Sequence, residues 1–107
     1  MMKERVNMLN QLVIVGRLTE NPVLEKNDEK NSFKINLAVP RNYKNINGEY
    51  DVDYIPCILW NIVGETTAIM CHKGDVLGIK GHIESIEDKI TVIAEKVTFL
   101  TSKRENE

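Results

Sequence analysis

The sequence has little of what several functional classes require. Only 6% of its 107 residues are aromatic, it has 2 cysteines, and its 14 Lys and Arg residues are outnumbered by 16 Asp and Glu residues, which gives a net charge of −2. Cys57 and Cys71 lack the CxxC spacing of redox motifs and the four ligands of a zinc site. We therefore expect packed, reduced thiols in a cytoplasmic protein, with no metal and no other cofactor.

Other absences narrow the function further. No hydrophobic stretch has the length of a signal peptide or a membrane span, so no membrane association is expected. No Ser-His-Asp triad, acid pair or Gly-rich phosphate loop stands out, which predicts a protein that is not an enzyme. The acidic balance argues against nucleic-acid binding, because phosphate binders usually carry a basic excess, but folding can gather scattered cations on one face.

What the sequence does have is apolar residues with the period of two that is typical of strands. The segment from Leu9 to Leu18 is apolar at both alternating positions, which predicts a strand covered on one side by the core and on the other by a second subunit. Pro40 ends the clean alternation of the next strand, which fits either a strand end or an edge. The remaining predicted elements are strands over Phe33–Val39, Asp51–Ile62, Asp75–Ser85 and Ile90–Leu100, a hairpin turn at Asn45–Gly48, and a short helix over Glu65–His72.

This order predicts an all-β fold, a five-stranded Greek-key barrel of the OB type with one short helix between strands 3 and 4. In the third strand Ile55, Cys57 and Leu59 suit the core, while Tyr54 and Trp60 lie on the opposite face. The chain divides into an N-terminal extension (residues 1–8), the barrel domain (residues 9–100) and a short polar tail (residues 101–107).

Four stretches resemble the bacterial single-stranded DNA-binding proteins, and they come in that family's order: LNQLVIVGRLTENP, LAVPRNYKNINGE, DYIPCILWN and CHKGDVLGIKGHIES. The resemblance runs from about Leu9 to Leu100. It implies an OB fold and a homo-oligomer, either a tetramer or a dimer. It also implies a protein that coats single-stranded DNA in replication, repair or recombination without strong sequence preference, with bases stacked on rings and cations along the phosphates.

The resemblance also implies the site residues. Tyr43 and Tyr54 fall where the family places base-stacking aromatics, and Trp60 matches a further ring of that surface. Packing inside the protein is the alternative role for these rings, and Tyr50 either joins them or packs across the hairpin. The expected phosphate contacts, whose alternative is a solvated surface charge, are Lys34, Arg41, Lys44, Lys73 and Lys80.

The sequence departs from the family's pattern in several places. Asn61 to Val63 follow Trp60 where the family often has basic residues, and the stretch from Glu25 to Glu29 is largely acidic. Weaker binding or a smaller footprint is therefore expected, and a second interpretation stays open: a protein–protein interaction module or accessory subunit that binds DNA weakly. The sequence ends in SKRENE, without the family's acidic-hydrophobic tip, so recruitment of partners through such a tip is not expected.

Overall fold

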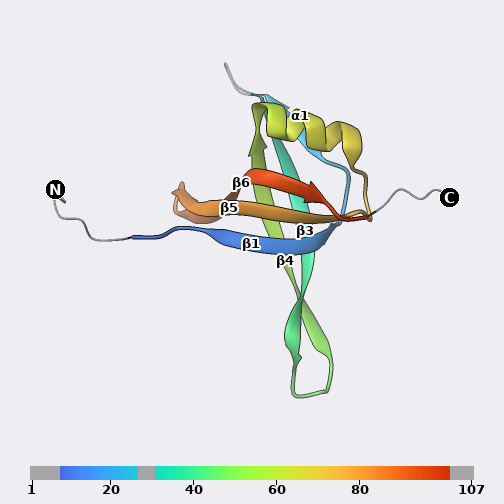
Figure 1. The fold of residues 1–107 in the computed structure, drawn as a ribbon. Helices are drawn as coiled ribbons and strands as arrows, with labels where there is room; N and C mark the ends of the chain where they lie inside the picture. The colour runs from blue at the N-terminus through green and yellow to red at the C-terminus, as the bar shows by residue number, and fades with distance from the viewer. Residues whose placement is uncertain (1–7, 27–30, 102–107) are drawn as a thin grey trace, which may run out of the picture.

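The computed structural model describes residues 8–26 and 31–101, and over these residues the chain forms six strands and one helix (Figure 1). The predicted N-terminal extension and polar tail lie outside the described residues, except for Met8 and Thr101. The strands are β1 (Leu12–Leu18), β2 (Val23–Lys26), β3 (Asn31–Lys44), β4 (Tyr50–Trp60), β5 (Val76–Ile86) and β6 (Lys89–Phe99), and the helix is α1 (Asn61–Met70).

Five of the strands close into a barrel. Neighbouring strands follow the order β1-β5-β6-β4-β3, and β1 returns to β3 through the antiparallel pairs Arg17 with Ala38 and Leu18 with Leu37. The β4–β6 pairing is parallel, whereas the others are antiparallel. The predicted five-stranded OB barrel, with a helix between its third and fourth strands, is confirmed.

The barrel interior holds the core that alternation predicts. Cys57 and Leu59 are fully buried, and Ile55 packs against them from the rim. Burying one such aliphatic side chain contributes roughly 1.5–3 kcal/mol. The buried hydrophobic residues of the core cluster come from β1, β3, β4, β5, β6 and the segment after α1: Leu18, Phe33, Ile35, Leu37, Cys57, Leu59, Cys71, Leu77, Ile79, Val92 and Ala94.

The prediction that β1 is covered on both sides is only half right within one chain. Leu12 and Ile14 pack against the core, but Val13 is 74% exposed and Val15 is 50% exposed. Alternating side chains of a strand point to opposite faces, so the two valines form an outward apolar strip.

Of the two positions that fit Pro40, a strand end or an edge, the structure shows the edge. β3 continues to Lys44, with an irregular register between Pro40 and Lys44. Proline is tolerated there because β3 beyond Ala38 has β4 as its only neighbour among the described strands, which makes it an edge. The β3–β4 hairpin therefore extends out of the barrel as a long two-stranded ribbon, residues 40–53, which we call the arm (Figure 1).

Two further boundaries differ from the sequence prediction. Val23 and Leu24, together with the first two residues of the polar stretch that follows, form the short strand β2, which pairs with the start of β3. The helix begins at Asn61 rather than Glu65, although Gly64 in its first turn is a poor helix former. A Cβ at Gly64 would lie 2.4 Å from the Phe33 ring, so the glycine lets α1 lie close against the barrel. Packing, rather than helix propensity, sets this boundary.

Candidate nucleic-acid interface

The outward side of β4 carries the aromatic residues that the sequence singles out. Residues paired across neighbouring strands share a face, and β4 pairs Tyr54 with Ala38 and Trp60 with Ser32. Tyr54 is 64% exposed and Trp60 is half-buried. At roughly 3.3 Å per residue, their Cα atoms lie roughly 20 Å apart along the strand. We call this outward side from Tyr54 to Trp60, with its neighbours on the adjoining strands, the ring face.

One row of paired residues crosses the ring face. Lys34 of β3 pairs with Ile58 of β4, Ile58 pairs with Ile93 of β6, and Ile93 pairs with His82 of β5. The centre of the row is therefore aliphatic, with the cation Lys34 at one end and the titratable His82 at the other. Lys34 is held by β2, because its Nζ lies 3.3 Å from Glu25 Oε2 and both side chains are about half exposed.

His82, at the other end of this row, lies between two carboxylates. Its Nε2 is 2.8 Å from Glu84 Oε2 and its Nδ1 is 2.5 Å from Glu95 Oε2. These hydrogen bonds, that with Glu84 foremost, raise the pKa of His82 above its usual value because they stabilise the protonated ring. The ring face is thus bordered by a group whose charge depends on pH.

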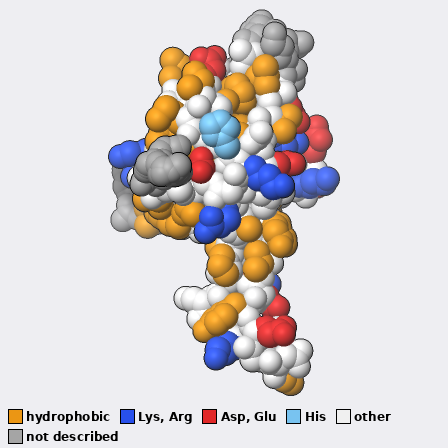
Figure 2. Space-filling model, turned by 90° about the vertical axis from the view of Figure 1, so that its right-hand side faces the viewer, with side chains coloured by type: hydrophobic (Ala, Val, Ile, Leu, Met, Phe, Trp, Pro, Cys, Tyr) orange, Lys and Arg blue, Asp and Glu red, His pale blue; other side chains and the backbone are white. Residues whose placement is uncertain are grey.

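The arm carries the second set of predicted site residues. Tyr43 is 60% exposed and Tyr50 is 54% exposed, so Tyr50 is not packed away inside the hairpin. Lys44 Nζ lies 5.8 Å from the centre of the Tyr50 ring, within the range of a cation–π contact. Figure 2 shows the arm projecting from the body, with hydrophobic side chains gathered where it leaves the barrel and both signs of charge along it.

The turn at the tip of the arm is built as the sequence predicts. Asn45 Oδ1 accepts hydrogen bonds from the backbone N–H groups of Asn47 (2.8 Å) and Glu49 (3.0 Å), and Gly48 has a φ of 80°. Such a side-chain to backbone pattern holds a tight turn without any buried residue. Ile46, at the tip, is 98% exposed.

Arg41 is engaged by carboxylates on the neighbouring strand. Its Nε and Nη2 donate to the two carboxylate oxygens of Asp53 at 3.1 and 2.9 Å, and its Nη1 lies 3.8 Å from Asp51 Oδ2. The hydrogen bond with Asp53 raises the pKa of Arg41, and the same bond lowers the pKa of Asp53. Asp51 and Asp53 alternate with Val52 and Tyr54 along β4, so this ion pair lies on the side of the arm away from Tyr54.

Two predicted phosphate contacts lie away from the ring face. Lys73 is exposed in the turn between α1 and β5, where its backbone N–H donates to Asn21 Oδ1 at 2.7 Å. Lys80 points outward from β5 between Val13 of β1 and Lys96 of β6.

The sequence did not point to one further cation, Arg17, that lies in the same row as Tyr54. Arg17 of β1 pairs with Ala38, which pairs with Tyr54, so the three share one row. Arg17 Nη1 also donates to the carbonyl of Gly74 at 2.7 Å. No local signal in the sequence reveals this neighbour, since barrel closure alone brings β1 beside β3.

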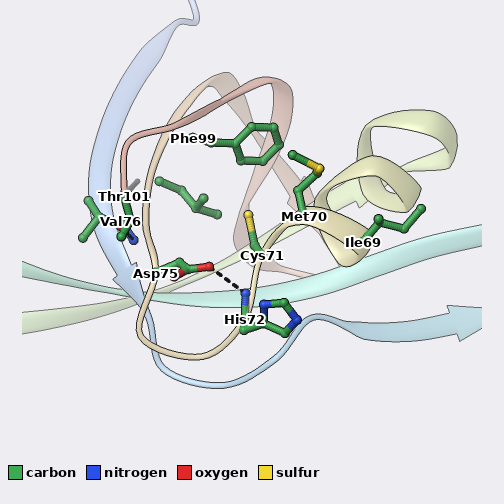
Figure 3. Close-up of a pocket in the computed structure, with 9 residues that line it drawn as sticks. Ile69, Met70, Cys71, His72, Asp75, Val76, Phe99 and Thr101 are labelled. Carbon is green, nitrogen blue, oxygen red and sulfur yellow. Dashed lines mark hydrogen bonds between the residues drawn. The ribbon is translucent and has the colours of Figure 1, made fainter. Parts of the chain in front are cut away.

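Two hollows in the described part of the molecule are lined by residues other than the predicted site residues. One of about 300 Å³ lies at the end of α1, where Cys71 points toward Met70 and Phe99, and the Asp75 carboxylate accepts from the backbone N–H of His72 at 2.9 Å (Figure 3). A shallower hollow of about 460 Å³ lies at the root of the arm, lined mainly by Val15, Arg17, Ala38, Pro40, Val52 and Val76.

The remaining chemistry of the chain is sparse. Both cysteines are buried, and burial raises the pKa of the Cys57 thiol to about 12, as expected for packed thiols. Within residues 8–26 and 31–101, no group of three or more His, Cys, Asp and Glu side chains is placed to hold a metal ion. No helix in this part of the chain has the length and apolar character needed to cross a membrane.

Comparison with known proteins fits this geometry. The model of the single-strand binding protein family matches residues 9–100, which is most of the sequence. The chain belongs to this family. The family consists of DNA-binding proteins rather than enzymes, in agreement with the prediction of a protein without catalytic activity.

Two relatives are each similar to this chain over 79 residues. "Single-stranded DNA-binding protein B" of Bacillus subtilis is 40% identical over 79 residues, 73% of this chain and 70% of that protein. "Single-stranded DNA-binding protein 1" of Lactococcus lactis is 39% identical over the same share of this chain but only 53% of its own length. The chain thus spans about half the length of some relatives that it matches.

A solved structure shows the same fold. The wild-type single-stranded DNA-binding protein from Thermus aquaticus aligns with a TM-score of 0.74 over 89% of this chain and 52% of that chain, at 22% sequence identity. At this identity the likeness concerns the fold, and it supports the OB barrel that the strand pairing shows.

Proposed function

We propose that this family member binds single-stranded DNA without strong sequence preference, by stacking bases on exposed rings and contacting phosphates with nearby cations. The observation that carries the proposal is the outward position of Tyr54, 64% exposed on the same face as Trp60. An exposed ring offers roughly 1–3 kcal/mol per stacked base, whatever the base. Protection of unpaired DNA in replication, repair or recombination, in the cytoplasm, is the role that fits this chemistry.

The path of the DNA follows from the positions of the rings and cations. Tyr54 and Trp60 stack bases on the ring face, and Tyr43 stacks a base on the arm. Lys34, Arg41 and Lys44 lie beside these rings and supply phosphate contacts. Lys73 and Lys80 contact phosphates only if the DNA strand continues around the barrel. Substitutions there therefore have smaller effects on DNA binding than substitutions at the rings.

A homo-oligomer, a dimer or a tetramer, is part of the proposal. The outward side of β1 presents Val13 and Val15, and the edge of β1 from Leu12 to Gly16 pairs only with β5 among the described strands. An apolar strip beside an open strand edge is a surface that a second copy of the chain can cover.

The second candidate function is an interaction module or accessory subunit with weak DNA affinity. The net charge of −2 and the carboxylates that hold Arg41 and Lys34 favour it. The two functions differ in intrinsic affinity for single-stranded DNA, since an accessory subunit binds tightly only together with a partner.

The deciding experiment is a titration of the purified protein with oligo(dT) and with duplex DNA at about 50 and 200 mM salt. We expect quenching of Trp60 fluorescence by oligo(dT), weaker binding to the duplex, and reversal by salt. Tyr54→Ala should weaken binding to oligo(dT) by at least several fold. No quenching and no change in the anisotropy of labelled oligo(dT) at low salt would reject the proposal in favour of the accessory role.

A further inference from the structure

Two of the cations near the rings, Lys34 and Arg41, are held by carboxylates, whereas Lys44 and Arg17 form no ion pair with a carboxylate of the described residues. Lys34 is paired with Glu25, and Arg41 is paired with Asp53 and approached by Asp51. Lys73 and Lys80, away from the ring face, form no ion pair within the part of the chain that the structure describes. Two of the cations proposed to meet DNA phosphates are thus already paired with a carboxylate.

The Arg41 pair has the geometry of a phosphate contact. Two guanidinium nitrogens donate to the two oxygens of one carboxylate, which is the fork arrangement by which arginine also binds a phosphate. While Asp53 holds this position, a phosphate cannot take the same donors. The nearby Tyr43 contributes to the raised pKa of Arg41, so the pair lies close to a ring that we expect to stack a base.

Glu25 pairs with Lys34 on the ring face, as Asp53 pairs with Arg41 on the arm. The β2–β3 register pairs Glu25 with Ser32, and Ser32 pairs with Trp60 on β4. Glu25 therefore lies in the same row as Trp60, and its ion pair with Lys34 runs diagonally to the next row. A DNA strand whose base stacks on Trp60 meets this carboxylate beside the lysine.

We propose that Glu25 and Asp53 limit the affinity for single-stranded DNA, because each acts as a built-in competitor that a phosphate must displace from Lys34 or Arg41. This inference rests on the proposed function and names the residues that set its strength. Both pairs are exposed, with side-chain exposures of 40–51%, so solvent screens them and they open at little cost. Binding then proceeds by exchange of one anion for another, and the net gain per cation is small.

The test compares Glu25→Gln and Asp53→Asn with the unaltered protein in oligo(dT) titrations followed by anisotropy. Each substitution keeps the size of the side chain and removes its charge. For single strands, the logarithm of the binding constant changes by about 0.7 per neutralised phosphate for each decade of salt. Gaining one full phosphate contact should therefore raise affinity about fivefold at 0.1 M salt.

Glu49→Gln is the matched control. Glu49 is exposed on the same arm and forms no ion pair with the described cations. Its substitution makes the same change in net charge, so it reports the general electrostatic effect alone. We expect its gain in affinity to be clearly smaller than that of either test variant.

A second set of variants removes the cation. If the gain comes from releasing Arg41, it should disappear in Arg41→Ala/Asp53→Asn relative to Arg41→Ala alone, and likewise for Lys34→Ala/Glu25→Gln relative to Lys34→Ala. Gains equal to that of Glu49→Gln, or gains that persist without the cation, overturn the inference. Circular dichroism and urea unfolding of each variant exclude loss of fold as the cause of a missing gain.

The outcomes separate this inference from the proposed function. If the unaltered protein binds oligo(dT) and the variants gain nothing, only the inference fails. If the unaltered protein does not bind but the variants do, the competition is complete and the inference holds. If none of the proteins binds oligo(dT), the proposed function fails and takes the inference with it.

Discussion

β3 and β4 run through both the barrel and the arm, yet the two regions are held together differently. Within the barrel, β3 and β4 bury every second side chain, among them Leu37 and Leu59, which are fully buried. Along the arm, residues 40–53, no residue is buried. There the ribbon is held by its hydrogen-bond ladder, the Asn45 turn and the ion pair between Arg41 and Asp53.

This difference separates stability from recognition. Most of the free energy of folding comes from apolar burial, so the barrel segments of β3 and β4 tolerate few changes. The arm contributes little burial, and its side chains can therefore serve a ligand. The four predictions below test this division, in order of decreasing expected effect.

The largest effect should come from the barrel. Leu59→Ala removes a fully buried side chain and should lower the free energy of unfolding by about 2–5 kcal/mol, measured by urea denaturation. The matched arm variant Ile46→Ala, at a position 98% exposed, should change it by less than about 0.5 kcal/mol. A comparable loss in the two variants would show that the arm is part of the cooperative core.

The next effect concerns the ring at the root of the arm. Tyr54→Ala should weaken oligo(dT) binding by about 1–3 kcal/mol, because one stacking surface is lost, with the free energy of unfolding almost unchanged. Tyr54→Phe keeps the ring and serves as the control, and it should bind nearly as the unaltered protein does. Equal losses for the two variants would assign the role to the hydroxyl rather than to stacking.

A third prediction sharpens the comparison at β1, which lines the hollow at the root of the arm. Val15→Glu puts a charge on the apolar strip of β1 and should shift the protein toward the monomer, measured by sedimentation velocity. Ile46→Glu makes the same charge change at the tip of the arm and should leave the assembly state as it is. Dissociation by the arm variant instead would locate the subunit contact on the arm.

The smallest effect is the pH dependence at the edge of the ring face. The raised pKa of His82 means that its stabilising contacts with Glu84 and Glu95 are fully present below about pH 6.5 and are lost as pH rises through the folded-state pKa. Deprotonation leaves two uncompensated carboxylates beside the row that contains Lys34. Both the free energy of unfolding and the affinity for oligo(dT) should therefore decline modestly as the pH rises through the folded-state pKa of His82.

His82→Gln is the control for this titration. Glutamine keeps a hydrogen-bonding side chain without the titrating charge, so its affinity should be flatter between about pH 6 and 9. An identical pH profile in the variant would assign the dependence to another group.

Sequence patterns predicted much of the barrel because alternation in a half-buried strand is a local property. Ile55, Cys57 and Leu59 were predicted inside and Tyr54 and Trp60 outside, and the register of β4 agrees. The motifs shared with the family supplied the candidate site residues, whose role in binding DNA stays a prediction. For Pro40 the sequence left a strand end and an edge both open, because whether proline is tolerated within a strand depends on whether a second neighbouring strand is present.

The sequence by itself determined the order of the strands, the inward and outward faces of β4, the tight turn at Asn45 and the identity of the family, since each depends on neighbouring residues or on a motif. Only the tertiary structure decided which charges meet. Glu25 reaches Lys34 through the pairing of β2 with β3, and His82 reaches Glu95 through the pairing of β5 with β6. Arg17 comes into the row of Tyr54 through barrel closure. Electrostatic partners depend on distance in space, which spacing along the chain does not encode.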